Sequence, residues 1–307
     1  MRRAASVLAN DSLLLLTAVI WGMAFVAQRV GMEHVGPFTY NAIRFALGSV
    51  SLLPLIAIRG NRAAAPAPDP AALKRWNAIP AGLIAGGILF FGASFQQTGL
   101  VTTTAGKAGF ITGLYVVLVP LAGLLWGQRA GWSSWAGAIL SVAGLFLLSV
   151  TDAFTIERGD MLVLIGAFFW AAHVQVVGLL SPRTDPFRLS CVQFAACSLL
   201  CAVCAALTEH VSLAGIRAAL WPILYGGVMS VGIAFTLQVV AQRRAPAAHA
   251  AIILSLETVF AAIGGILILG EGLAPRGAAG CVIMFSGMIV SQVPLIAASL
   301  AGGARRV

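Results

Sequence analysis

Two charged side chains interrupt apolar runs that are long enough to cross a lipid bilayer. Glu257 lies well inside the run 247–269, and Arg44 lies inside the run 38–58. A charged group at the centre of a bilayer costs about 2.5 to more than 10 kcal/mol unless it finds a partner or water. Glu257 must therefore take up a proton, pair with a cation or face a wet cavity. We expect it to bind a substrate amine or a proton, or else to be a structural carboxylate.

Two basic residues are candidates for holding a substrate carboxylate. Arg44 must face the interior of a helix bundle, where it either binds a substrate carboxylate or pairs with a backbone carbonyl or with Glu257. Lys107 stands at the outer start of the predicted span 106–126. It either attracts anions at the mouth of a cavity or extends its amine to the membrane surface, as lysines near span ends commonly do.

Three aromatic residues lie near the middle of predicted spans rather than at the membrane interface, where such rings are enriched. They are Trp21, Trp170 and Tyr115. We expect their rings to line a cavity, with plain helix packing as the alternative. The sequence shows no nucleophile–base pair, no metal-ligand spacing and no paired catalytic carboxylates. We therefore expect no enzymatic activity, no cofactor and no metal site.

The composition places these residues in a membrane protein. The 307 residues are 60% hydrophobic and only 9% charged, with a mean hydropathy of +0.96, whereas soluble domains carry about 25% charged residues. Because a spanning helix needs roughly 20 mostly apolar residues, the sequence predicts an all-α polytopic membrane protein with ten transmembrane helices. The predicted spans are 12–31, 38–58, 78–98, 106–126, 132–150, 160–180, 187–207, 218–241, 247–269 and 274–297.

The ten predicted spans form two sets of five that share a residue pattern. Trp21 recurs 149 residues later as Trp170, and Gln96 recurs 142 residues later as Gln238. We therefore expect two five-helix repeats, residues 1–151 and residues 152–307. Because five crossings are an odd number, the second repeat must cross the membrane in the opposite sense. Inverted repeats of this kind build alternating-access transporters around a site near the bilayer midplane.

The distribution of positive charge predicts the orientation of the chain. With ten spans and the N-terminus inside, 13 of the 19 Lys and Arg residues fall in cytoplasmic segments and 5 in outer segments. This is the positive-inside bias, so we expect both termini in the cytoplasm and no nucleic-acid partner. The spans 132–150 and 274–297 each carry two glycines at seven-residue spacing. Such spacing suits close helix packing or the interface of a homodimer.

Five short motifs occur in order along residues 12–297. They are Ile20-Trp21-Gly22, Asn41 to Phe45, Thr104 to Ile111, Leu254 to Phe260, and Leu269-Gly270-Glu271. Together they resemble the drug/metabolite transporter superfamily, in its ten-helix form with two EamA-type repeats. That family usually has proline after the glutamate, whereas this chain has Thr258, so no proline forces a kink beside Glu257. The resemblance implies an inner-membrane carrier, often an exporter of amino acids or related metabolites, with its cavity between the two helix sets.

The residues and the resemblance together predict a secondary active transporter of the inner membrane. It would export small metabolites such as amino acids by alternating access, with protons as a candidate coupling ion. Arg44 and Lys107 would bind a substrate carboxylate, and Glu257 would bind an amine or a proton. A proton-coupled efflux pump for hydrophobic cations is one alternative. A membrane scaffold or sensor that transports nothing is another.

Overall fold

The computed structural model describes residues 2–59, 76–103, 105–125, 127–128, 130–149, 157–269 and 275–304, and all regular elements in these ranges are helices. Eight helical segments of the described chain are long and apolar enough to cross a membrane. The prediction of an all-α polytopic membrane protein is therefore confirmed, whereas the count of ten spans stays a prediction. The predicted repeat boundary at 151/152 lies outside the described residues, as do Thr104, Gly270 and Glu271.

The first half of the chain contains six helices. They are α1 (Arg2–Gly31), α2 (Pro37–Arg59), α3 (Ala78–Gly99), α4 (Ala105–Gly113), α5 (Tyr115–Leu125) and α6 (Trp132–Ser149). The second half contains more and shorter elements. They are α7 (Arg158–Leu180), the 3₁₀ turn η1 (Ser181–Arg183), α8 (Pro186–Thr208), α9 (Leu213–Ala218), α10 (Leu220–Leu224), the π-helix η2 (Tyr225–Phe235), α11 (Thr236–Gln242), α12 (Ala247–Leu254), α13 (Glu257–Leu269) and α14 (Pro275–Ala304).

The fourth and ninth predicted spans are each divided into two helices. Leu114 separates α4 from α5, and Ser255 with Leu256 separates α12 from α13. Both breaks contain tight i to i+3 hydrogen bonds, from the Leu114 N–H to the Ile111 carbonyl and from the Leu256 N–H to the Ile253 carbonyl, each 3.2 Å. The helix thus breaks just before Glu257 although no proline follows that residue.

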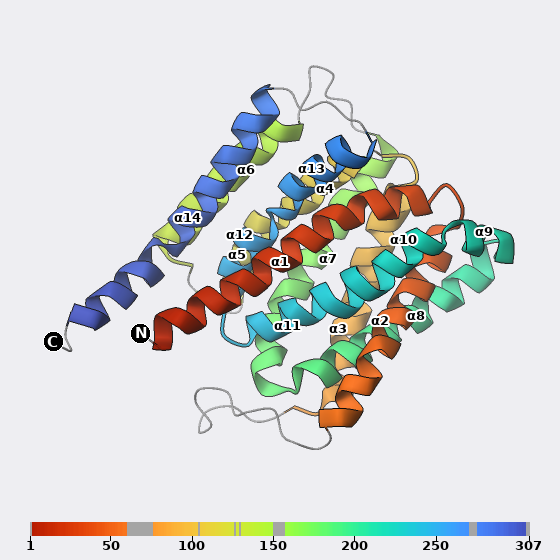
Figure 1. The fold of residues 1–307 in the computed structure, drawn as a ribbon, viewed down its shortest axis with the longest axis horizontal. Helices are drawn as coiled ribbons and strands as arrows, with labels where there is room; N and C mark the ends of the chain where they lie inside the picture. The colour runs from red at the N-terminus through yellow and green to blue at the C-terminus, as the bar shows by residue number, and fades with distance from the viewer. Residues whose placement is uncertain are drawn as a thin grey trace.

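Helices of the two halves pack against one another in pairs. α2 contacts α8, α1 contacts η2 and α13, and α3 contacts α7 and α8. Figure 1 shows α1 running through the bundle beside elements of the second half. α7 is the counterpart of α1 in the second half, and η2 lies in the counterpart of α3. The contact of α1 with η2 therefore corresponds to the contact of α7 with α3, as expected of a duplicated bundle. The opposite membrane orientation of the halves stays a prediction.

α6 and α14 lie side by side along one edge of the bundle (Figure 1). Their glycines meet: a Cβ added at Gly137 would lie 2.8 Å from the Gly287 carbonyl oxygen, and one at Gly144 would lie 2.5 Å from that of Gly280. Only glycine allows backbones to approach this closely. The predicted packing role of these glycines is thus met within one chain, and a homodimer through α6 and α14 would have to use their other faces.

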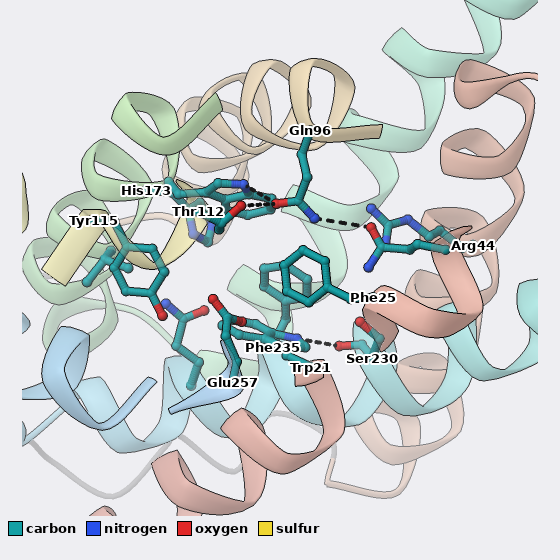
Figure 2. Close-up of a pocket in the computed structure, with 14 residues that line it drawn as sticks. Trp21, Phe25, Arg44, Gln96, Thr112, Tyr115, His173, Ser230, Phe235 and Glu257 are labelled. Atoms are coloured by element: carbon teal, nitrogen blue, oxygen red, sulfur yellow. Dashed lines mark hydrogen bonds between the residues drawn. The ribbon is translucent and has the colours of Figure 1, made fainter. Parts of the chain in front are cut away.

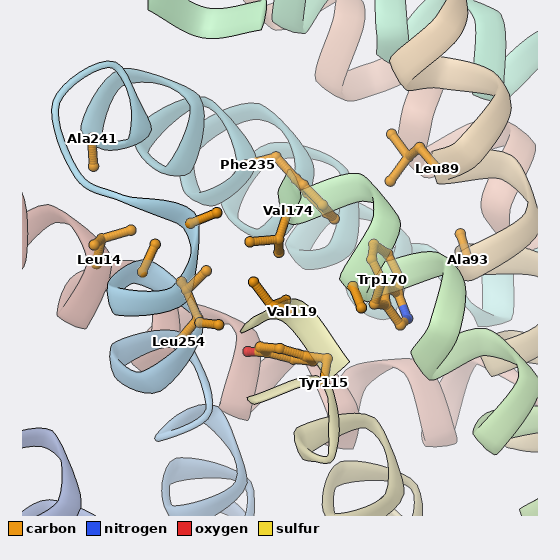
Figure 3. Packing of buried hydrophobic residues seen from close by; sticks show 14 of the residues in the cluster. Leu14, Leu89, Ala93, Tyr115, Val119, Trp170, Val174, Phe235, Ala241 and Leu254 are labelled. Carbon is orange, nitrogen blue, oxygen red and sulfur yellow. The ribbon is translucent and has the colours of Figure 1, made fainter. Parts of the chain in front are cut away.

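The largest cluster of buried apolar side chains draws on both halves of the chain (Figure 3). Leu14, Leu89 and Val119 come from the first half, and Phe235 and Leu254 come from the second. Their packing fixes the helices that surround a small pocket.

Candidate functional site

A pocket lies where the two halves meet, beside the C-terminal half of α1, and Figure 2 shows its lining. It includes five of the six residues that the sequence singled out: Trp21, Arg44, Tyr115, Trp170 and Glu257. The other lining residues are Phe25, Gln28, Gln96, Thr112, His173, Val174, Ser230, Phe235 and Gln238.

Glu257 is the first residue of α13, directly after the break in the ninth predicted span. Its side chain is buried, with 3% of the residue exposed. The break creates a new helix N-terminus, whose partial positive charge favours a carboxylate. Among the described residues no cation forms an ion pair with Glu257. In Figure 2 its carboxylate and the Tyr115 hydroxyl point into the same part of the pocket.

The backbone around Glu257 is held by two close contacts. A Cβ added at Gly22 of α1 would lie 2.6 Å from the Glu257 carbonyl oxygen and would also meet the Phe260 side chain. The Thr258 hydroxyl donates a hydrogen bond of 3.0 Å to the Gly109 carbonyl of α4. Gly22 thus lets α1 approach the start of α13, while Thr258 ties that start to α4.

Arg44 is 2% exposed, and its guanidinium faces the pocket from α2. Its Nε donates to Asn41 Oδ1 over 2.9 Å, and Asn41 Nδ2 donates in turn to the Ala93 carbonyl over 3.1 Å. Its Cζ lies 4.8 Å from the centre of the Phe45 ring, which is a cation–π distance. Within the part of the chain that the structure describes, Arg44 forms no ion pair, so it does not pair with Glu257.

Phe235, at the end of η2, is the centre of an aromatic cluster in the pocket wall. Its ring centroid lies 4.5 Å from that of Trp21 and 5.9 Å from that of Trp170. The indole N–H of Trp21 donates to the Ser230 carbonyl over 3.2 Å, and that of Trp170 donates to Gln96 Oε1 over 2.7 Å. Phe235 was not predicted as a site residue, because it is one apolar residue in an apolar run. The available signal was its position one helical turn before Gln238.

Two glutamines at equivalent positions of the halves differ in their bonding. Gln96 accepts from Trp170 and from Thr112, and its Nε2 donates to Gln28 over 3.1 Å. Gln238 is fully buried and lines the pocket, yet neither atom of its amide has a partner among the described residues. A buried amide without partners is costly, so Gln238 is suited to bind a ligand.

Arg44 and its counterpart in the second half give the pocket an uneven charge. Gln193 follows Arg44 by 149 residues, and its Oε1 lies 3.0 Å from Nε2 of His173. The first half therefore contributes a guanidinium to the lining, whereas in the second half the lining residue is His173, and Gln193 pairs with it from outside the lining. With Glu257 added, the lining combines one cationic and one anionic side chain with aromatic walls, which suits a ligand with unlike ends.

Lys107 is the predicted site residue that does not line the pocket. It lies at the start of α4, where its Nζ is 3.5 Å from Glu157 Oε1 and 3.7 Å from Asp160 Oδ2. These acidic groups belong to the start of α7, where Asp160 also accepts from the Glu157 N–H and the Thr103 hydroxyl. A contact of Lys107 with substrate stays a prediction. The structure instead links Lys107 to the start of α7, at one end of the bundle.

Comparison with known proteins places this chain in a family. The EamA-like transporter family matches residues 9–150 and again residues 157–292. A protein of Archaeoglobus fulgidus named "Uncharacterized transporter" is 30% identical over 278 residues, which is 90% of this chain and 83% of the relative. "Uncharacterized transporter YcxC" of Bacillus subtilis is 23% identical over 92% of each chain. A crystal structure of a protein 19% identical has a TM-score of 0.74 over 93% of this chain and 97% of that one, which shows the fold alone. The chain belongs to the EamA-like transporter family.

Proposed function

We propose that this chain is a secondary active transporter of the inner membrane that exports small polar or amphipathic metabolites, amino acids foremost, by alternating access. The observation that supports it is the meeting of Arg44 and Glu257 in one pocket without an ion pair between them. A zwitterion has a carboxylate for Arg44 and an amine for Glu257. Because both partners come from the substrate, binding of the substrate would compensate both buried charges at once.

The aromatic residues and Gln238 would set the shape of the bound substrate. Trp21, Trp170 and Phe235 offer ring faces to an apolar side chain. Gln238 offers an amide that lacks a protein partner among the described residues. Protons are the candidate coupling ion, with Glu257 as the group that would take one up when no amine is present. Both termini are placed in the cytoplasm on the distribution of Lys and Arg.

A survey of metabolites in the growth medium tests export directly. A strain that overproduces the wild-type chain should accumulate one or more amino acids outside the cell relative to a deletion strain. Overproduction of Glu257→Gln at the same membrane level should abolish that difference. Glu33→Gln makes the same chemical change at an exposed residue of the α1–α2 turn and should leave export intact. Identical media from the deletion strain and the overproducing strain would overturn the proposal.

A proton-coupled efflux pump for hydrophobic cations is the second candidate, and the aromatic cluster beside Glu257 favours it. Arg44 in the same pocket opposes it, because a buried guanidinium repels cations. Drug-resistance profiles separate the two. Resistance of the overproducing strain to lipophilic cations, without a change in medium amino acids, would select the efflux pump.

A further inference from the structure

Two acid–base pairs, each joining one half of the chain to the other, lie outside the pocket. His249 Nε2 lies 2.8 Å from Asp11 Oδ1, which joins α12 to α1. Lys107 Nζ lies 3.7 Å from Asp160 Oδ2, which joins α4 to α7. His249, Lys107 and Asp160 are each the third residue of their helix.

The two pairs are formed by residues at corresponding positions of the two halves. Asp160 follows Asp11 by 149 residues, the separation of Trp21 and Trp170. His249 follows Lys107 by 142 residues, which is also the separation of Gln96 and Gln238. Each pair therefore links the first helix of one half to the start of the broken helix of the other half.

The pairs lie at opposite ends of the bundle, with the pocket between them. Gln97 Nε2 donates to the Gln28 carbonyl, which places the end of α1 beside the end of α3. Thr103, just after α3, donates to Asp160. Asp160 therefore lies at the Gln28 end of α1. Asp11 precedes Gln28 by 17 residues, so it lies about 25 Å away along the helix. Figure 1 shows the starts of α1 and α12 at one end and the starts of α4 and α7 at the other.

The two pairs differ in their dependence on protons. Asp11 and His249 are 8% and 5% exposed, and neither Asp11 Oδ2 nor His249 Nδ1 has another partner among the described residues. Histidine is the side chain whose charge ordinarily changes between about pH 5 and pH 8. Lysine stays charged over that range, and Asp160 is held by two further donors. Only the Asp11–His249 contact therefore depends on whether an imidazole carries a proton.

The helices packed against α12 carry few other ionisable groups. The helices packed against α12 are α1, α5, α6, α7 and α14. Besides Asp11, their described ionisable side chains are Arg29, Tyr115, Arg158, Asp160, His173, Arg276 and Cys281, and Arg243 and Arg244 precede α12 in the chain. In the described ranges, Asp11 is the group on these helices that pairs with His249.

We propose that the two pairs are matched gates of the transport cycle, one at each end of the pocket, and that His249 is a proton-binding site that controls one of them. Protonated His249 holds the Asp11 carboxylate and closes the end at which α1 begins. Loss of the proton weakens the contact and lets that end open, while Lys107–Asp160 keeps the other end closed. This rests on the alternating access of the proposed function, which needs two ends that open in turn.

Hydrogen–deuterium exchange of the full-length protein in lipid nanodiscs tests the gates without any substrate. Exchange is compared at about pH 5.5 and pH 8, which span the histidine range, after correction for the intrinsic rate. In the wild type, amides near Asp11 and in α12 should open roughly tenfold more at the higher pH, as expected when a charge-assisted bond is lost. His249→Lys should keep these amides protected at both values, and Asp11→Asn should leave them open at both.

The matched control transfers the proton dependence to the other gate. Lys107→His should create pH-dependent opening at the starts of α4 and α7, where the wild type shows none. The proposal is overturned if the wild type opens equally at both pH values, or if His249→Lys keeps the wild-type dependence. Because no transport is measured, this result is independent of whether the exporter itself proves right, and Asp11→Asn and Lys107→His decide the matter should His249→Lys fail to fold.

Discussion

Tyr115 and Glu257 occupy the same position in the two halves, 142 residues apart, and their side chains face the same pocket. Each is the first residue after a helix break, since α5 begins at Tyr115 and α13 begins at Glu257. A symmetric frame thus presents a phenol on one side and a carboxylate on the other. This difference allows a duplicated pocket to bind an asymmetric substrate in one orientation.

Tyr115→Phe should separate binding from stability. The Tyr115 hydroxyl is buried beside Glu257 and makes no hydrogen bond of good geometry among the described residues, so its removal should cost the fold little. The unfolding temperature in detergent should stay unchanged or rise, while substrate affinity falls by about 1 kcal/mol, the contribution of a typical hydrogen bond. Tyr40→Phe is the matched contrast, because that hydroxyl donates to the Pro222 carbonyl over 2.9 Å. It should lower the unfolding temperature, and equal stabilities of the two variants would contradict this reasoning.

Gly22→Ala should destabilise the protein through the contact of α1 with α13. The added methyl group would overlap the Glu257 carbonyl and Phe260, and such overpacking typically costs about 1–3 kcal/mol. Gly87→Ala is the control, since nothing lies within 4 Å of a Cβ at that residue. Thermal unfolding followed by tryptophan fluorescence should show a lower midpoint for Gly22→Ala alone. A midpoint equal to that of Gly87→Ala would contradict the claim that close packing of α1 against α13 at Gly22 stabilises the protein.

The family, the helical membrane fold and five of the fourteen residues that line the pocket were predictable from the sequence. A charge inside an apolar run is expensive, so Arg44 and Glu257 had to face the interior, and the residue offsets matched Trp21 with Trp170. The helix breaks were not predictable on the same grounds. Backbone inside a bundle can depart from α-helix without changing its side-chain hydropathy, and no proline marks Leu114 or Leu256. The ion pairs of Lys107 were missed because they depend on packing between the halves.

Arg44→Lys tests whether the guanidinium itself is needed. Lysine keeps the charge but cannot preserve both the planar stacking on Phe45 and the Nε bond to Asn41. Binding of a carboxylate-bearing substrate should weaken by roughly tenfold, because a bidentate partner becomes a point charge. Arg44→Gln should weaken binding of that substrate further. It should weaken binding of the corresponding amine that lacks the carboxylate much less. Arg217→Gln, at an exposed residue, controls for net charge, and equal losses for both substrates would remove the assigned role.

Phe235→Ala should weaken the whole pocket wall. The ring lies 4.5–6.1 Å from five other rings, those of Trp21, Phe45, Trp170, His173 and Phe194. Removing a buried phenyl ring costs about 3–5 kcal/mol, so the unfolding midpoint and transport should both fall. Phe168→Ala removes the same group from a residue that is 56% exposed and should have little effect. A normal midpoint for Phe235→Ala would mean that the aromatic cluster does not hold η2 in place.

Flux through purified protein in liposomes tests the central claim, that Arg44 and Glu257 line the path of a transported solute. Wild-type protein should exchange at least one radiolabelled amino acid, from a panel of all twenty, faster than empty liposomes do. Glu257→Gln should abolish that exchange while retaining the wild-type elution profile, and Glu33→Gln should keep it. Wild-type exchange by a correctly folded Glu257→Gln variant would contradict the account.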